Sequence, residues 1–135
     1  MARPALLVDA GGLIAIANAR DRLHQPTLAV LAEFFGDLIT TWPAITEACH
    51  IVPVHLEVAL VEKLSGPRWR ILGMDGAAPR IAEFLRKYAD RPMDLADASM
   101  LWAADQTGTT RILTADRADF EIYRTKSGRK LEVLP

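Results

Sequence analysis

The chain has 135 residues, half of them hydrophobic, and its 16 Lys and Arg nearly balance its 17 Asp and Glu, which leaves a formal net charge of −1. The length predicts one compact domain over residues 1–135, and the charge excludes a broadly basic protein that coats duplex nucleic acid. The single Cys49 cannot form an internal disulfide, so we expect a reducing, cytoplasmic location. No apolar run reaches transmembrane length, and we expect no contact with a membrane.

The run from Ala5 to Val8 is apolar throughout and ends at Asp9, ahead of Gly11 and Gly12. A continuous apolar run of this length predicts a strand that is buried on both faces. In open parallel α/β sheets, ligands bind at the carboxyl ends of such strands, where Asp9 would lie. Asp9 taken alone also fits the N-cap of the helix that follows. The rest of the chain has to separate these two interpretations.

Helical and strand patterns alternate along the remainder of the chain. Apolar spacing and Pro or Gly boundaries predict helices near 13–18, 24–35, 44–52, 54–64, 79–88 and 95–107. Short apolar runs predict strands at 38–42, 69–72, 111–114 and 131–134. This alternation indicates an α/β fold, a three-layer α/β/α sandwich with a mostly parallel sheet of four to five strands. Right-handed crossovers would bring the carboxyl ends of the strands to one edge. The three tryptophans occur in apolar segments and are interpreted as packing residues: Trp42, Trp69 and Trp102.

Four acids occur at matching points of this pattern. Asp9 and Asp116 follow apolar strands, Glu47 comes about one turn into the helix after a third strand, and Asp97 lies early in an apolar helix. Two ionised carboxylates about 4 Å apart repel by roughly 4 kcal/mol at an effective dielectric near 20, so their convergence favours a bound cation. An all-oxygen ligand set favours Mg²⁺ or Mn²⁺ over zinc. The chemistry that fits is metal-assisted phosphoryl transfer with one ion or two.

Structural roles remain open for several acids. Glu47 alone would be a solvated helix residue, and Asp116 alone would cap a turn. Asp94 fits the N-cap of the helix that begins near residue 95, which is the interpretation we favour over a ligand. Asp119 is either a further ligand or a loop acid. The conjunction of the four acids is what favours the metal site.

Several motifs together resemble those of PIN-domain proteins. They are Val-Asp-Ala-Gly at 8–11, Glu47 after Trp42 and Pro43, Asp-Leu-Ala-Asp-Ala at 94–98 and Leu-Thr-Ala-Asp-Arg at 113–117. The match spans nearly the whole chain. Its length, the segment 87–97 and the Asp-Phe pair at 119–120 are similar to the toxin branch called VapC, of the VapBC toxin-antitoxin systems.

The resemblance implies a Mg²⁺- or Mn²⁺-dependent endoribonuclease that cleaves structured cellular RNA. Asp9 and Asp97 would then be the principal metal ligands, with Glu47 and Asp116 completing the acidic pocket. Many relatives carry Ser or Thr two residues after the first acid, whereas this chain has Gly11. The hydroxyl that would orient a ligand or phosphate at that position is therefore missing.

The resemblance also implies partners. A cognate VapB-like antitoxin would hold the toxin inactive, often by placing a basic side chain in the acidic pocket, and the toxin would form a homodimer. Apolar residues of the early helices, such as Leu28, Leu31 and Phe35, would receive an antitoxin helix. A basic cluster after the last catalytic strand is either an RNA-contacting rim or an ordinary solvated tail: Arg117, Arg124, Lys126, Arg129 and Lys130.

Two other functions fit parts of the pattern. The first is a catalytically silent PIN-like module that binds RNA or protein, although a surface for phosphate gains nothing from clustered acids. The second is a phosphotransferase with an aspartyl-phosphate intermediate, whose nucleophile also follows a first strand. Such enzymes of the haloacid dehalogenase class usually have a second Asp where this chain has Gly11, which disfavours that function.

Overall fold

The computed structural model describes residues 3–135 and contains a five-stranded sheet in which every neighbouring pair is parallel. The order across the sheet is β3-β2-β1-β4-β5. The strands are β1 (Ala5–Val8), β2 (Asp37–Thr41), β3 (Trp69–Leu72), β4 (Arg111–Leu113) and β5 (Glu132–Leu134). The sheet is therefore at the upper end of the predicted size, and both of its edge strands, β3 and β5, are short.

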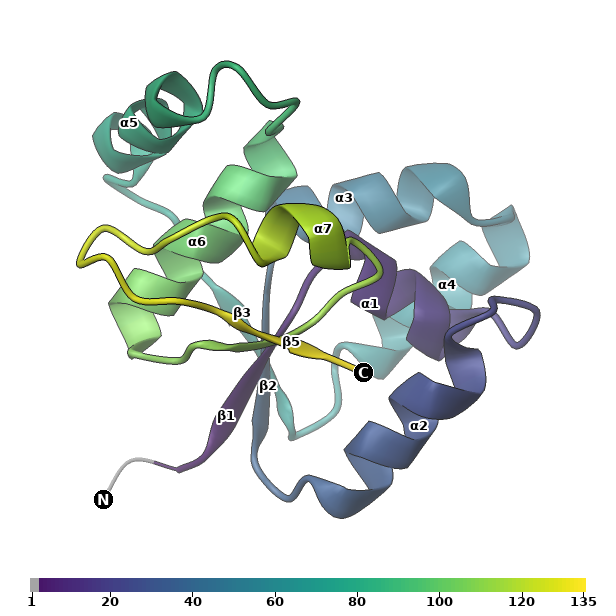
Figure 1. Ribbon diagram of the computed structural model, residues 1–135. Coiled ribbons are helices and arrows are strands. Elements are labelled where there is room, and N and C mark those ends of the chain that lie inside the picture. Colours follow the sequence, from purple (N-terminus) through teal and green to yellow (C-terminus); the bar gives the residue numbers. More distant parts are fainter. Residues whose placement is uncertain (1–2) are drawn as a thin grey trace.

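Helices cover both faces of the sheet and complete three layers (Figure 1). One side carries α1 (Ala10–Ala17), α2 (His24–Glu33) and α4 (Val54–Lys63), and the other carries α5 (Ala78–Lys87) and α6 (Leu95–Thr107). The helix α3 (Trp42–Ile51) contacts both α1 and α6, and the short α7 (Arg117–Phe120) follows β4. This arrangement confirms the predicted α/β/α sandwich.

The helix boundaries follow from capping side chains. Thr41 ends β2 and accepts a hydrogen bond from the Ala44 amide, so the chain turns from strand to helix within one residue. Asp94 caps α6, as the sequence predicted, and Gly108 ends that helix with a left-handed φ of 69°. No helix in residues 3–135 is long and apolar enough to cross a membrane.

The core confirms most of the apolar pattern but not the role of Trp42. Leu6, Leu7 and Val8 of β1 are fully buried, as expected for a central strand. Trp102 is buried and Trp69 packs partly against the core. Trp42 is instead 55% exposed, so its interpretation as a packing residue is wrong. The physical reason is that Thr41 already caps α3, which makes Trp42 the first helical residue rather than the last strand residue.

The strand order reverses between β1 and β4. From β1 the chain proceeds outward through β2 and β3 and then returns to the other side of β1 for β4 and β5. Ligands of open α/β sheets bind outside the carboxyl ends of the strands at such a reversal. The residues that follow β1 and β4 are thus the ones that this topology places at a candidate site.

Candidate active site

Asp9 lies directly between β1 and α1 and serves as the N-cap of that helix. Its Oδ1 accepts a hydrogen bond from the Gly12 amide at 2.9 Å, and its own amide donates to the Leu113 carbonyl of β4 at 3.2 Å. Its side chain is nearly fully buried. The structure therefore confirms the cap and places the same carboxylate at the carboxyl end of the strand, whereas its role in binding a ligand stays a prediction.

Thr114 links the two acids that follow neighbouring strands. Its hydroxyl donates to Oδ2 of Asp9 and accepts a hydrogen bond from the Asp116 amide at 2.9 Å. The sequence analysis did not find this role, because Asp9 and Thr114 are 105 residues apart. The available signal was the position of Thr114, which is the last residue before the turn that carries Asp116. The pairing of Val8 with Leu113 brings Thr114 next to Asp9.

A cleft of about 410 Å³ collects the acids at this end of the sheet. All four predicted site residues line it, and so do the two acids whose roles were left open: Asp9, Glu47, Asp94, Asp97, Asp116 and Asp119. Asp94 and Asp97 form a capping box at the start of α6, with the Asp97 amide donating to Asp94 at 2.8 Å. Their capping role and their place in the cleft thus coexist.

Burial and mutual repulsion raise the pKa of the central carboxyl groups. Burial raises the pKa of Asp9 to about 7 against the opposing effect of its hydrogen bonds, and the charges of Asp116 and Glu47 add to the rise. Burial and the charge of Asp94 likewise raise the pKa of Asp97 to about 7. The pKa values of Glu47 and Asp116 are also raised, chiefly by burial. Ionising all of these groups together is therefore costly without a counter-charge.

The donor set fits a divalent cation of the Mg²⁺ type. Hard cations prefer carboxylate oxygens, and a bound cation would remove the repulsion that raises these pKa values. Within residues 3–135, no three His, Cys, Asp or Glu side chains are gathered tightly enough to hold an ion as they stand. Cation binding at this cleft would thus require side-chain rotations, for which the partly buried Glu47 and the exposed Asp116 are freer than the buried Asp9.

Asp119 differs from the other acids of the cleft because it forms an ion pair with an arginine. Nη2 of Arg91 donates to its Oδ1 at 2.6 Å, and this contact holds the pKa of Asp119 below its usual value. The Arg91 side chain comes from the loop between α5 and α6, whereas Asp119 lies on α7. The sequence had left Asp119 as a ligand or a loop acid, and the structure places it in an ion pair at the wall of the cleft.

Gly11 packs where a side chain would collide with the turn after β4. A Cβ built on Gly11 would lie 2.9 Å from Cβ of Ala115 and 3.0 Å from its amide nitrogen. The approach of α1 to the turn after β4 thus leaves no room for Ser or Thr at this position. The hydroxyl group next to Asp9 comes from Thr114 instead.

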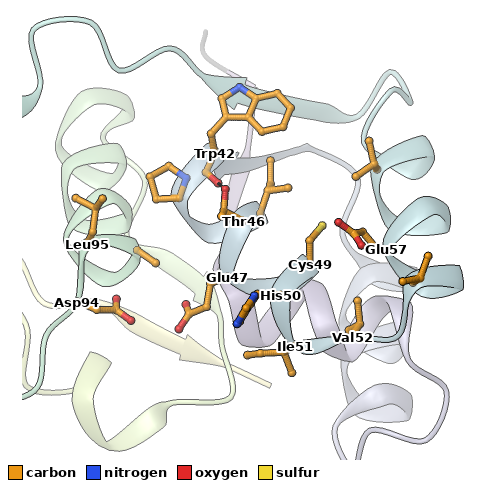
Figure 2. A pocket seen from close by; sticks show the side chains of 15 residues that line it. Trp42, Thr46, Glu47, Cys49, His50, Ile51, Val52, Glu57, Asp94 and Leu95 are labelled. Carbon is orange, nitrogen blue, oxygen red and sulfur yellow. Dashed lines mark hydrogen bonds between the residues drawn. The ribbon is translucent and has the colours of Figure 1, made fainter.

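An apolar groove of about 1200 Å³ adjoins the acidic cleft. It runs between α3, α4 and the start of α6, and Glu47, Asp94 and Ile51 border both cavities. Figure 2 shows Glu47 of α3 and Asp94 pointing into the same space at one end of the groove. Its exposed apolar residues are Trp42, Ile51, Val54, Val61 and Leu95. The sequence predicted a docking face on α2 and the turn after it, here called the α2 face. Leu28 and Phe35 are indeed exposed there, but Leu31 packs partly against the core, and the sequence did not predict this groove.

The basic residues after β4 are largely engaged in contacts within the protein. Arg117 pairs with Glu121 at 2.9 Å, and the Arg124 guanidinium donates to three backbone carbonyls of the preceding turn. Lys126 pairs with Glu83 on α5 at 3.0 Å. These contacts favour the solvated-tail interpretation over the RNA-contacting rim for these three residues.

Comparison with known proteins agrees with this fold. No protein-family model matches the chain. Ribonuclease VapC26 of Mycobacterium tuberculosis is 26% identical to it in an alignment that covers 96% of this chain and all of that protein.

Solved structures match over nearly the full length. The crystal structure of VapC20 of Mycobacterium tuberculosis, described as a Sarcin-Ricin loop cleaving toxin, superimposes with a TM-score of 0.80 at 17% identity, covering 96% of this chain and 99% of that one. FitAcB from Neisseria gonorrhoeae matches with a TM-score of 0.59 at 14% identity and covers 96% of both chains. The chain is thus similar in sequence to a VapC ribonuclease and shares its fold with a VapC toxin.

Proposed function

We propose that the chain is a Mg²⁺- or Mn²⁺-dependent endoribonuclease that acts as the toxin of a VapBC-type toxin-antitoxin system. The observation that carries this proposal is the convergence of six carboxyl groups in one cleft at the reversal of strand order. Two of these groups have pKa values raised to about 7, which marks a site that lacks its counter-charge. The likeness to a ribonuclease and to an RNA-cleaving toxin supports RNA as the substrate.

Four of these acids have a role in this proposal that follows from their surroundings. Asp9, fixed by Thr114 and Gly12, and Asp97, at the start of α6, are the residues that would hold the cation. Glu47 and Asp116 lie in the same cleft and would complete the acidic pocket. A bound cation would lower the pKa of water and stabilise the charge that develops on the scissile phosphate. Burial of Asp9 keeps its carboxylate in one orientation, which favours a defined geometry for the reaction.

The test is cleavage of total cellular RNA, ribosomal RNA included, by the purified, antitoxin-free protein with Mg²⁺, Mn²⁺ or EDTA. We expect discrete fragments that require the cation and that fall by at least about a hundredfold in yield in Asp97→Asn. Asp75→Asn is the matched control, because Asp75 is an exposed turn residue outside the cleft and undergoes the same chemical change. Fragments that form equally in EDTA, or equally in Asp97→Asn, would contradict the proposed site.

The alternative function is a catalytically silent PIN-like module that binds RNA or protein. Folded protein that binds RNA but gives no fragments with either cation would favour this alternative. The six acids of the cleft weigh against it, because phosphate binding alone would be weakened by them.

We also propose that a VapB-like antitoxin binds in the apolar groove between α3 and α4. The groove exposes large apolar side chains and opens onto the acidic cleft through Glu47 and Asp94. An antitoxin segment whose amphipathic helix binds in the groove would therefore be able to place a Lys or Arg side chain in the cleft. This site differs from the α2 face that the sequence indicated.

Introducing a charged side chain into the groove should show which of the two candidate faces binds the antitoxin. Val54→Asp should weaken antitoxin binding by at least about tenfold, because it introduces a charge into an apolar contact. Phe35→Asp is the matched control on the α2 face, since both side chains are strongly exposed and neither replacement disturbs the core. Calorimetry with the cognate antitoxin measures both affinities. A loss in Phe35→Asp with no loss in Val54→Asp would move the docking site to α2.

Homodimer formation and a cytoplasmic location complete the proposal. The VapC resemblance supports the homodimer, and RNA as the proposed substrate supports the cytoplasmic location. Light scattering on the purified toxin measures the oligomeric state, and a mass that stays at that of one chain at all concentrations would contradict the homodimer.

A further inference from the structure

Arg91 is a cation that contacts the acidic cleft from behind its lining, through Asp119 and next to the lining residue Pro92. Its backbone amide donates to the Tyr88 carbonyl at 2.9 Å, which fixes the loop between α5 and α6. Its Nη2 donates to Asp119, an acid that lines the cleft. The Arg91 side chain is 32% exposed. The guanidinium is therefore held beside the acids while part of it faces solvent.

The Arg91 guanidinium has more donors than it uses. An arginine side chain carries five N–H donors in a planar fork, and within residues 3–135 this one makes a hydrogen bond to Asp119 alone. Its Nε is buried without an acceptor, and the hydroxyl of the fully buried Tyr123, close enough to influence Arg91 electrostatically, also has no partner. Because unpaired buried polar groups destabilise a fold, stability alone does not explain this arrangement.

The cleft offers a phosphate group few other cations. None of the residues that line it in the described part of the chain is Lys, Arg or His. The basic residues Arg117, Arg124 and Lys126 are engaged elsewhere, with Glu121, backbone carbonyls and Glu83. An RNA phosphate that approaches the carboxylates is repelled by them unless a positive charge lies close by. Arg91 offers such a charge, because its guanidinium pairs with the lining residue Asp119 and its side chain is partly exposed.

We propose that Arg91 binds an RNA phosphate at the edge of the acidic cleft, with Asp119 holding its guanidinium in orientation. This inference rests on the proposed function, because it names how the same cleft holds its substrate. The planar fork binds phosphate through two parallel hydrogen bonds, which a lysine ammonium cannot reproduce. Asp119 occupies one Nη2 hydrogen and leaves other N–H groups of the fork for the phosphate.

A purely structural ion pair makes a different prediction. In that case Arg91 would only tie the α5–α6 loop to α7, and its loss would change stability without changing the number of phosphate contacts. The dependence of RNA affinity on salt counts those contacts, since each contact on a single strand contributes about 0.7 to the slope of log affinity against log salt concentration. The salt slope therefore separates the two roles.

The experiment measures RNA binding in an Asp97→Asn background, which prevents cleavage during the titration. The probe is a fluorescently labelled single-stranded RNA of mixed sequence, and anisotropy is recorded over a series of NaCl concentrations with Mg²⁺ present. Arg91→Gln should weaken binding by about five- to tenfold at low salt and reduce the slope by about 0.7. Arg91→Lys should retain the slope with an intermediate affinity. Lys126→Gln is the matched control, because it removes one positive charge that is paired with Glu83 away from the cleft, and it should change neither quantity.

An unchanged slope and affinity in folded Arg91→Gln would overturn the proposal. If that variant does not fold, Arg91→Gln combined with Asp119→Asn removes both partners of the ion pair, leaves no unpaired charge and repeats the test. If the unsubstituted chain cleaves RNA and Arg91→Gln leaves the salt slope unchanged, only the proposed role of Arg91 is refuted and the nuclease proposal stands. A reduced slope with no cleavage by the unsubstituted chain would support Arg91 as a phosphate ligand and would instead refute the nuclease.

Discussion

Replacing Asp9 with Asn should abolish RNA cleavage and raise the stability of the metal-free protein at the same time. A shift of the Asp9 pKa from 3.8 to about 7 corresponds to a cost of roughly 4 kcal/mol for keeping this carboxylate ionised in the fold. The amide of Asn carries no charge, and it retains an oxygen for the Gly12 amide and an N–H that the Thr114 hydroxyl can accept. Catalysis is lost because a neutral amide is a poor ligand for a hard cation.

The measurement is a pair of assays on Asp9→Asn in EDTA above about pH 8. Thermal unfolding should give a melting temperature at least about 4 °C above that of the unsubstituted chain, and the RNA assay should show no fragments with Mg²⁺ or Mn²⁺. Asp75→Asn controls for the general effect of removing one negative charge, since Asp75 is exposed. A variant that melts lower than the unsubstituted chain, or that still cleaves RNA, would contradict this account of Asp9.

The sequence predicts the fold well because its signals are local. The uninterrupted apolar run of β1, the capping residue Asp94 and the left-handed Gly108 each act within a few residues, and all were readable from the chain. The convergence of the acids was also predictable. Parallel strands joined by right-handed crossovers bring their carboxyl ends to one edge, so acids that follow strands must come together there.

What the sequence did not predict depends on contacts between distant segments. The register between β1 and β4 sets Thr114 against Asp9, and the packing of the α5–α6 loop on α7 sets Arg91 against Asp119, 28 residues later. No local pattern carries this information. The exposure of Trp42 has a different origin, because an apolar run does not reveal which residue ends the strand and which begins the helix. The groove that Trp42 borders was missed for the same reason.

These contacts give the cleft two kinds of acid. Asp9 is buried and fixed by hydrogen bonds, and its pKa is raised by its surroundings. Asp119 is paired with Arg91, and its pKa is lowered. A cation that enters the cleft would stabilise the ionised form of Asp9, whereas the charge of Asp119 is already compensated by the Arg91 guanidinium. A cation should therefore act mainly on Asp9 and its neighbours Asp97, Glu47 and Asp116.

The pH dependence of stability should consequently reverse when a divalent cation is added. Because the folded-state pKa of Asp9 and Asp97 is above the unfolded value, these groups contribute stability that is fully present below about pH 4 and is lost as the pH rises through about 7. In EDTA, the melting temperature of the unsubstituted chain should fall relative to that of Asp9→Asn between about pH 5 and about pH 8. With millimolar Mn²⁺ the sign changes, since the cation binds ionised carboxylates and displaces their protons, so its stabilisation grows as the pH rises. At a concentration about a hundred times its dissociation constant, Mn²⁺ would add about 3 kcal/mol to the free energy of unfolding.

Thermal unfolding of both proteins at the two pH values, with Mn²⁺ or EDTA, measures the pH dependence of the stability and the stabilisation by Mn²⁺. A difference between the two proteins in EDTA that does not change with pH would show that Asp9 does not titrate in this range, and a Mn²⁺ effect that is larger at the acid end would show that the cation binds without displacing protons from this cleft.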